Sequence, residues 1–368
     1  MRVALDASFL LLNQASGMKT YTRDLLNALL ESRPEVSWVC WYNVFRSSVA
    51  NVPSWSSPTC DVVCRLPRRL LEGSWRRLAF PPIDWFTGPI DIFHAVHLQV
   101  PPVRHARTVL TIHDLREFRL PHLYPRLQGL RAWRRQMAAQ ADHVITISEA
   151  TRRDIVEFFQ LPPERVSVAH NGLASQYLNG GLDRSQVEAI LERLGLAGVP
   201  YVLTVSSRDP RKDVPTALRA MRRWQEREPD LLLVLVGPLP AGAAAGEGVR
   251  HLGFVDDPVL QALMQGAQVF LLPSLYEGFG LPVLEAQASG VPVVACNVSA
   301  LPEVAGSTAI LVPPGDDEAM ADAVYRLLTD TELRTRLVAA GSTRARSFTW
   351  KAHGEKVYEV YRQLTGSR

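Results

Sequence analysis

The sequence predicts an α/β protein made of two doubly wound domains that face each other across a cleft. Its 368 residues are too many for one ordinary core and correspond to two domains of roughly 150 residues or slightly more. Hydrophobic residues make up 47% of the chain and charged residues 21%, which excludes a mainly disordered protein. In both halves short apolar runs alternate with helical patterns, as in parallel sheets covered by helices.

The first half opens with an apolar strand at residues 2–9. A polar turn at Ser16 and Gly17 follows, and then a helix whose apolar residues recur at helical spacing. The remaining elements expected here are strands at 37–42, 92–95, 108–112, 143–147 and 165–169, and helices at 126–141 and 149–159.

The second half begins after Gly180 and Gly181, a glycine pair that favours a linker. We therefore expect domains at residues 1–178 and 179–346. A helix at 184–194 leads into the second series, which comprises strands at 201–205, 231–236, 269–272, 293–295 and 309–312, and helices at 214–227, 258–266, 282–289 and 316–329. Residues 347–368 form an aromatic-rich amphipathic helix.

Several functional classes are disfavoured by what the sequence lacks. No apolar run approaches the ~18 residues of a membrane span, and Asp6 interrupts what would be the core of a signal peptide. The four cysteines show no metal-binding spacing, which favours a reducing, cytoplasmic location. A net charge of only +3 argues against a nucleic-acid partner. No Gly-x-Gly-x-x-Gly follows the first strand, which argues against a dinucleotide dehydrogenase.

The glycine-rich segment after strand 269–272 predicts an anion site. Gly278 and Gly280 let the backbone turn tightly, and Pro282 suits the start of a helix. The amides of residues 279–281 (Phe279, Gly280 and Leu281) would then point out of a helix N-terminus, which binds phosphate. Glu285 is expected in the first turn of this helix, where it can accept hydrogen bonds from a vicinal diol, and Glu277 in the preceding loop.

A second loop in the same domain, residues 207–212, is basic and also follows a strand. Asp213 is the expected N-cap of the next helix. A cation such as Lys212 before a helix N-terminus is unfavourable for the helix, and is better explained if an anion binds there. Two loops directed at anions in one domain predict a nucleoside diphosphate ligand.

We expect no metal ion at this site. The sequence has no Asp-x-Asp triplet of the kind that holds a divalent ion against a diphosphate. The run Asp316-Asp317-Glu318 is interpreted as a helix start, and His94 and His97 are not expected to bind metal. Lys212 and the helix dipole would stabilise the leaving diphosphate instead.

These motifs together resemble retaining glycosyltransferases of family 4, which have the GT-B fold. The resemblance spans nearly the whole chain, and is closest to bacterial mannosyl- and rhamnosyltransferases of surface polysaccharide assembly. The segments that carry it are Ser16-Gly17, Thr111-Ile-His113-Asp-Leu, Val144-Ile-Thr-Ile-Ser148-Glu, Val168-Ala-His-Asn171-Gly172, Pro210-Arg-Lys212, Glu277-Gly-Phe-Gly-Leu-Pro-Val-Leu-Glu285, Ala300-Leu-Pro-Glu303-Val and Leu311-Val-Pro-Pro-Gly315.

The resemblance implies two Rossmann-like domains, with acceptor binding in the first and donor binding in the second. It also implies that the helix at 347–368 crosses back to the first domain. Glu285 would hold the ribose, and Glu277 the hydroxyls of the transferred sugar. Lys212 and the amides of residues 279–281 would neutralise the diphosphate, with help from Arg208 or Arg211.

In the first domain the resemblance assigns two further positions. Gly17 would let the backbone approach the diphosphate, and His113 would face the sugar or the acceptor. Glu277, His113 and Lys212 would be the catalytic residues. The chain departs from the family pattern where Met18-Lys19-Thr20 follows the first glycine and at Ser206, where a glycine is common.

The predicted function is therefore metal-independent transfer of a hexose, mannose or similar, from a nucleoside diphosphate sugar to a glycan or polyprenyl-linked acceptor. A GDP-sugar is favoured over UDP- or dTDP-sugars. The alternatives are a nucleotide-sugar epimerase of similar architecture and a transferase with a soluble small-molecule acceptor.

Two arginine clusters bear on the acceptor and on where the protein acts. We expect a cytoplasmic protein, with peripheral contact to the inner face of the membrane as one interpretation and solvated arginines as the other. The clusters are Arg65, Arg68, Arg69, Arg76 and Arg77, accompanied by Trp75, and Arg126, Arg131, Arg134 and Arg135.

Overall fold

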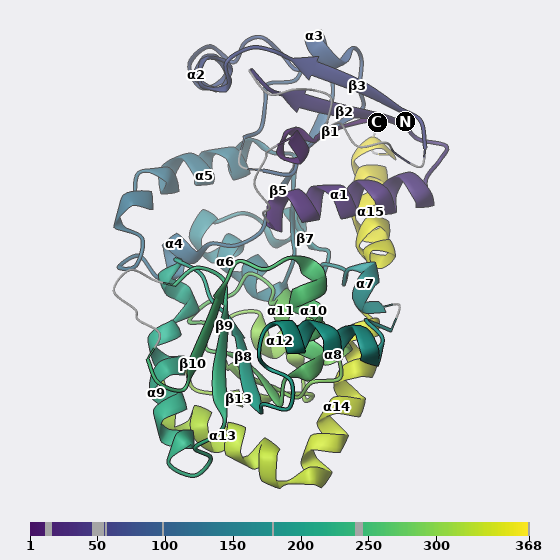
Figure 1. Cartoon of the computed structure of the whole chain (residues 1–368). Helices are drawn as coiled ribbons and strands as arrows, with labels where there is room; N and C mark the ends of the chain where they lie inside the picture. The colour runs from purple at the N-terminus through teal and green to yellow at the C-terminus, as the bar shows by residue number, and fades with distance from the viewer. Residues whose placement is uncertain are drawn as a thin grey trace. The chain divides into compact units, whose positions relative to one another are not determined.

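The computed structural model describes residues 1–11, 17–45, 55, 57–97, 99–178, 180–239 and 246–366. The chain forms two compact units, shown in Figure 1. Unit 1 comprises Met1–Gly172 and Thr349–Arg368, and unit 2 comprises Leu173–Phe348. Each unit is a parallel sheet with helices, so the predicted fold class of two α/β domains is confirmed.

Unit 1 contains a seven-stranded parallel sheet in the order β3-β2-β1-β4-β5-β6-β7. Its apolar central strands are buried, as expected where helices cover both faces. The strand order reverses between β1 and β4. The strands are β1 (Arg2–Asp6), β2 (Ser37–Asn43), β3 (Thr59–Cys64), β4 (Ile92–Ala95), β5 (Arg107–Ile112), β6 (His143–Thr146) and β7 (Val166–Val168).

The helices of unit 1 follow the predicted alternation, with some corrections. The first strand ends at Asp6 rather than at residue 9, because the Asp6 carboxylate accepts from the Ser8 amide (3.0 Å) and turns the chain into a short 3-10 helix. Ser16 lies outside the described residues. The helices are α1 (Gly17–Ser32), α2 (Arg68–Leu78), α3 (Asp84–Thr87), α4 (Arg116–Arg119), α5 (Leu130–Gln140) and α6 (Glu149–Phe159).

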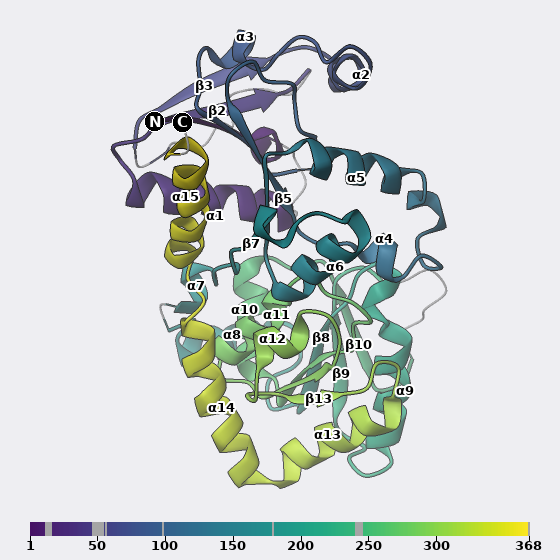
Figure 2. The same cartoon turned by 180° about the vertical axis from the view of Figure 1, so that it is seen from behind.

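The last helix, α15 (Trp350–Gly366), belongs to unit 1, which confirms that the chain crosses back. In Figures 1 and 2 it lies beside α1, and a Cβ at Gly354 would come within 3.3 Å of the Ala28 Cβ. Buried hydrogen bonds fix it to the sheet: His94 bonds to the Tyr361 hydroxyl (2.6 Å) and to the Thr111 hydroxyl (2.7 Å). His94 is thus part of the core packing of α15.

Unit 2 contains a six-stranded parallel sheet in the order β10-β9-β8-β11-β12-β13. The order reverses between β8 and β11, and ligands of such sheets bind beyond the carboxyl ends of the strands at that point. The strands are β8 (Tyr201–Val205), β9 (Leu232–Val236), β10 (Val249–Gly253), β11 (Val269–Leu272), β12 (Val293–Cys296) and β13 (Ile310–Val312).

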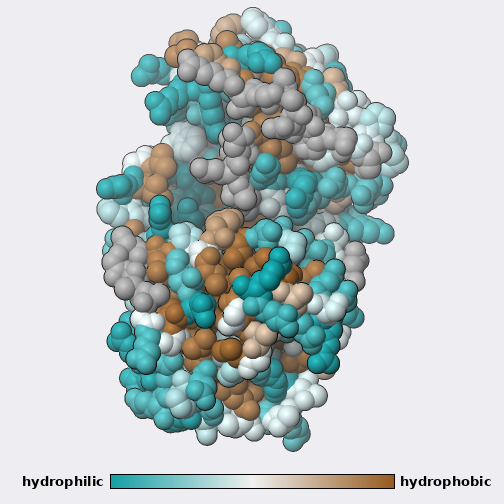
Figure 3. Space-filling view, in the orientation of Figure 1, coloured by the Kyte–Doolittle hydropathy of each residue, from teal (hydrophilic) through white to brown (hydrophobic). Residues whose placement is uncertain are grey.

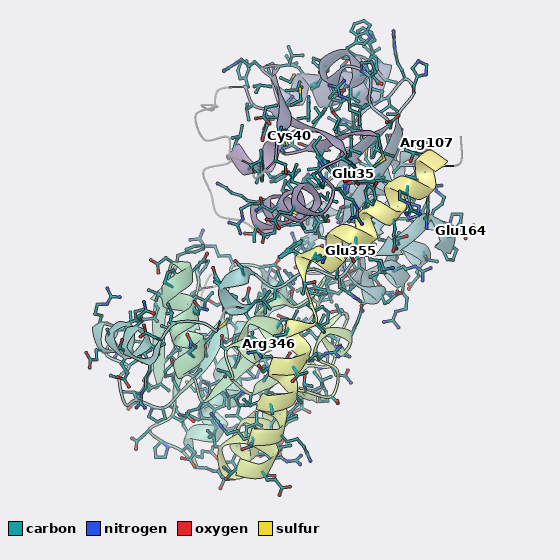
Figure 4. The ribbon with its side chains drawn as sticks, turned by 90° about the vertical axis from the view of Figure 1, so that its right-hand side faces the viewer. Glu35, Cys40, Arg107, Glu164, Arg346 and Glu355 are labelled. Carbon is teal, nitrogen blue, oxygen red and sulfur yellow. The ribbon has the colours of Figure 1, made fainter. Side chains whose placement is uncertain are left out.

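The helices of unit 2 surround this sheet. Asp316 accepts from the Ala319 amide (2.9 Å), so the acidic run at 316–318 is the helix start that the sequence predicts. The helices are α7 (Ser175–Leu178), α8 (Arg184–Arg193), α9 (Val214–Gln225), α10 (Asp257–Gly266), α11 (Leu281–Ala288), α12 (Leu301–Ala305), α13 (Asp317–Thr329) and α14 (Thr331–Arg346). Figure 4 labels Arg346, the last residue of α14 in unit 2, and Glu355 on α15 in unit 1.

The chain passes between the units at Gly172 and again at Phe348, whereas Gly180 and Gly181 lie within unit 2. The first passage therefore comes a few residues before the expected boundary at 178. A Cβ at Gly172 would lie 2.2 Å from the Trp350 backbone nitrogen, so only glycine allows the two backbone segments to come this close. The glycine of the passage thus serves close packing rather than a flexible linker.

Candidate functional site

The two loops predicted to bind an anion lie side by side in unit 2. One follows β8 and contains residues 207–212, and the other follows β11 and contains residues 273–280. Since β8 and β11 are neighbours at the reversal of strand order, their loops meet at the switch point. The Leu275 amide donates to the Arg211 carbonyl (2.7 Å), which joins the loops directly.

Glu277 is the centre of this site. Its buried carboxylate accepts from Lys212 Nζ (2.6 Å) through one oxygen and from Arg211 (2.5 Å) through the other. The Ser274 hydroxyl donates to it at 2.7 Å, and its backbone amide donates to the Ser299 hydroxyl at 2.7 Å. We call Glu277, Lys212 and Arg211 the Glu277 cluster.

The charges of the cluster decide its protonation. Burial by itself raises the pKa of the Glu277 carboxyl, but the positive charges of Lys212 and Arg211 outweigh burial and bring this pKa down to about 2. Glu277 is therefore ionised at neutral pH, and the site combines one buried carboxylate with two cations.

The two cations differ in what remains available to a ligand. Arg211 is occupied on several sides, because it also bonds to the Asp209 carboxylate (3.1 Å) and to the Tyr276 carbonyl (2.8 Å). Lys212 has three donors, and among the described residues its ammonium bonds to Glu277 alone. Arg208 is exposed and has no hydrogen bond in the described part of the chain. Lys212 is thus the cation inside the site that still has hydrogen-bond donors to offer a ligand.

The N-terminus of α11 borders the same loop. Gly280 precedes it with a φ of 109°, and a Cβ there would lie 2.7 Å from the Leu301 side chain, so both conformation and space require glycine. Phe279 is buried and packs edge-on against Phe348, which fixes the loop. Pro282 has no amide hydrogen, and the Val283 amide donates to the Gly280 carbonyl (3.0 Å), which leaves the Leu281 amide as the one in this first turn that a helix N-terminus can direct at a ligand.

Glu285 lies on α11, slightly beyond the first turn in which the sequence placed it, because the helix already begins at Leu281. Burial and the neighbouring charge of Asp257 raise its pKa to about 7, while Lys212 acts in the opposite direction. Its carboxylate has no hydrogen-bond partner among the described residues. Glu285 is therefore an available acceptor close to the charge of Lys212.

Two of the predicted site residues, Gly17 and His113, belong to unit 1. Gly17 is the exposed first residue of α1. His113 follows β5, and its Nε2 lies 3.3 Å from the Val96 carbonyl while Tyr21 packs edge-on against its ring. Burial lowers the pKa of His113 to about 4, so the imidazole is neutral at pH 7.

The arginine cluster of α5 is largely used within unit 1. Arg131 bonds to the Glu117 carbonyl, Arg134 is buried in an ion pair with Glu117, and Arg135 bonds to the Phe158 carbonyl. These three arginines therefore hold α5 in place and are not a free basic face.

Sequence reasoning missed three supporting residues: Asp209, Ser274 and Ser299. Asp209 orients Arg211, and the two serines fix the carboxylate and the backbone of Glu277. Their only signal in the sequence is their place in loops that follow strands. Among the described residues, no group of three or more His, Cys, Asp or Glu side chains could hold a metal ion.

Two family models match large parts of the chain. Residues 199–330 match the family model described as "Glycosyl transferases group 1", and residues 15–176 match "Glycosyltransferase Family 4". The chain is 30% identical over 295 residues to the O-antigen chain mannosyltransferase B of Escherichia coli, a match that covers 74% of each chain. It is 27% identical to a D-inositol 3-phosphate glycosyltransferase of Corynebacterium glutamicum, covering 75% of this chain and 70% of that protein.

Among solved structures, a sucrose-phosphate synthase of Thermosynechococcus elongatus matches all of both chains with a TM-score of 0.77 at 23% identity. This likeness shows the fold. The two parallel sheets with their helices are those of the GT-B fold. The family-model matches and the mannosyltransferase relative show that this protein is an enzyme that transfers glycosyl groups. It belongs to glycosyltransferase family 4. None of the described helices is long and apolar enough to cross a membrane.

Proposed function

We propose that this glycosyltransferase moves a hexose, mannose or a similar sugar, from a nucleoside diphosphate sugar to a hydroxyl of a glycan or polyprenyl-linked acceptor. The transfer retains the anomeric configuration and needs no metal ion. The observation that carries the proposal is the Glu277 cluster, which gathers two cations beside the N-terminus of α11 at the switch point of unit 2.

The donor diphosphate is the group that this charge suits. As the glycosidic bond to phosphate breaks, negative charge grows on the leaving diphosphate. Lys212 and the N-terminal amide of α11 are fixed before the reaction, so they stabilise this charge more in the transition state than in the ground state. In this mechanism they do the work that a divalent ion does in other transferases.

The two acids take different roles. Glu285, with an unoccupied carboxylate, accepts from the ribose diol of the nucleotide. Glu277 contacts hydroxyls of the transferred sugar, and its ion pairs hold Lys212 toward the diphosphate. The contributions of Gly17 and His113 from unit 1 stay predictions.

The sugar and the acceptor are proposed from the relatives. The name of the O-antigen chain mannosyltransferase relative supports mannose as the sugar and a glycan as the acceptor, and on that basis we propose a GDP-sugar donor and a glycan or polyprenyl-linked acceptor. A soluble acceptor is the second candidate, because several relatives are named D-inositol 3-phosphate glycosyltransferases. With a lipid-linked acceptor, the protein would act in the cytoplasm in peripheral contact with the membrane.

The donor is tested by thermal unfolding with GDP-mannose, UDP-glucose and dTDP-rhamnose, since a ligand of the folded state raises its stability. We expect the largest shift with GDP-mannose, and the same shift with EDTA. Stabilisation by the UDP- or dTDP-sugar alone would contradict the donor assignment.

The reaction is tested by proton NMR of the product formed with EDTA present. An axial anomeric linkage from an axial donor is expected. An inverted product would contradict retention, activity that needs added Mg²⁺ would contradict metal independence, and epimerised donor without any acceptor would contradict transfer.

A further inference from the structure

The segment around α2 and α3 in unit 1 exposes large apolar side chains that a soluble surface normally covers. Leu70 and Leu78 of α2 are 70% and 72% exposed, and Trp85 of α3 is 56% exposed. Leu66 and Phe80 are also exposed, at the two ends of α2. An exposed apolar group of this size within twenty residues marks an interaction surface rather than scattered single residues.

Arginines alternate with these apolar residues. Residues 65–85 contain five arginines against Glu72 and Asp84, a net charge of +3 that equals the formal net charge of the whole chain. Arg68 pairs with Glu72, while the other four are exposed. The exposed apolar residues and these four, namely Arg65, Arg69, Arg76 and Arg77, are here called the α2–α3 surface.

The helix itself separates a packed side from a free side. Leu71 and Trp75 are one turn apart and buried, and the Trp75 indole donates to the Pro81 carbonyl (2.8 Å). Trp75 is therefore a core residue and not the membrane-contacting residue that the sequence suggested. At 100° per residue, Arg69 and Arg76 point about 120° to 140° away from the middle of this packed side, and Leu70 lies about 120° away on the opposite flank, next to Arg77. Leu78 falls in line with Leu71 and Trp75 but is exposed, because it is the last residue of the helix.

The chain after α2 continues the same surface. The Ser74 hydroxyl donates to the Phe80 carbonyl, which holds this turn against the helix. Phe80 packs edge-on against Trp85, with ring centroids 4.9 Å apart, and the Arg104 guanidinium lies 5.5 Å from the Trp85 ring. Figure 3 shows hydrophobic and hydrophilic side chains side by side over the end of unit 1 that carries α2 and α3.

We propose that the α2–α3 surface docks unit 1 on an anionic lipid bilayer, with Leu70, Leu78 and Trp85 entering the interfacial region and the arginines contacting lipid phosphates. Arginine side chains can keep their charge at the headgroups while leucine and tryptophan sit deeper. The charge of the segment selects an anionic surface over a neutral one. The α5 arginines take no part, because they are bound within unit 1.

This inference deepens the lipid-linked acceptor of the proposed function, but its test reads lipid binding alone. The full chain is sedimented with vesicles of phosphatidylcholine and with vesicles that also contain phosphatidylglycerol, at low and at high salt. We expect binding to the anionic vesicles at low salt that falls at high salt. Equal binding to both vesicle types, or binding to neither, would overturn the proposal.

Two double variants test whether the arginines of this surface, and not the net charge of the chain, drive binding. Arg69→Glu with Arg76→Glu should lower the partition coefficient at least tenfold, since each arginine near an anionic leaflet contributes about fivefold. The matched control, Arg222→Glu with Arg336→Glu, reverses two exposed arginines of unit 2 and should leave binding nearly unchanged. A loss of the same size in both double variants would reduce the effect to net charge and refute a specific surface.

Insertion is read from brominated lipids, which quench tryptophan fluorescence at short range. We expect quenching in the parent chain and its loss in Trp85→Phe, while the buried Trp75 stays unquenched. Quenching that survives in Trp85→Phe would refute insertion at this residue. The alternative to a membrane is a second copy of this chain, and light scattering of the parent chain tests it. If the parent chain is a dimer, and Leu70→Ser with Leu78→Ser converts it to a monomer, this face is a contact between two chains and the proposal is overturned. Donor hydrolysis should be the same in all these variants, so failure of lipid binding would leave the proposed transferase activity standing.

Discussion

Replacing Glu277 with glutamine tests the site most directly, because it keeps the shape of the side chain and removes its charge. In the native site the two carboxylate oxygens accept from Lys212 and Arg211. A glutamine amide offers one oxygen and turns an NH₂ group toward the second cation. One buried cation then faces a donor instead of an acceptor, which is strongly unfavourable.

The magnitude follows from the pKa of Glu277. The folded site lowers this pKa from 4.5 to about 2, and each unit of pKa corresponds to about 1.4 kcal/mol, so the cations and burial together favour the ionised form by about 3 kcal/mol. Because the pKa is lowered on folding, this contribution is fully present above pH 4.5 and is lost as the pH falls toward 2. At neutral pH, Glu277→Gln should therefore lower the free energy of unfolding of unit 2 by about 3 kcal/mol.

The assay is hydrogen exchange of unit 2 at pH 7, together with turnover at saturating donor. The matched control is Asp317→Asn, since Asp317 also accepts from two arginines, Arg219 and Arg223, but both of these are about half exposed. Solvent screens such a pair, so the control should change stability little. Native-like exchange in Glu277→Gln would refute the buried cluster, and native turnover would remove Glu277 from the sugar site.

The remaining predictions concern donor binding, the pH dependence of donor affinity and of the rate, and the stabilisation of unit 1 by α15. Lys212→Ala should weaken donor binding and turnover together by about 10- to 100-fold, which is the value of a hydrogen bond to a charged group. Arg208→Ala should change both quantities little, and equal losses in the two variants, measured by steady-state kinetics, would contradict this ranking. Because ionised Glu285 accepts from the ribose, donor affinity by calorimetry should rise as the pH passes through about 7, and Glu285→Gln should abolish that rise. His113 is neutral above its pKa of about 4, so the rate profile between pH 5 and 8 should keep its shape in His113→Gln, and a changed shape would show that it titrates there. Deleting residues 347–368 should speed hydrogen exchange across unit 1, and unchanged exchange would refute bracing by α15.

The strands that the sequence predicted are those whose residues are continuously apolar and buried, such as β8, β11 and β12. It missed β3 and β10, which lie at the edges of their sheets. Edge strands are covered on fewer sides, so their residues are partly exposed and alternate with polar ones, and no apolar run marks them.

The sequence by itself determined the two-domain α/β fold, the family and the position of the two loops that we propose to bind an anion, because these depend on local patterns and on motifs read along the chain. Only the tertiary structure decided which side chains meet. Lys212 and Glu277 are 65 positions apart, and they touch because β8 and β11 are neighbours in the sheet. The two arginine clusters also look alike in sequence. Folding ties the arginines of α5 into bonds to carbonyls and to Glu117, although only Arg134 among them is buried, and leaves most arginines of α2 in solvent. Packing partners, and not composition, fix what a charged side chain contacts.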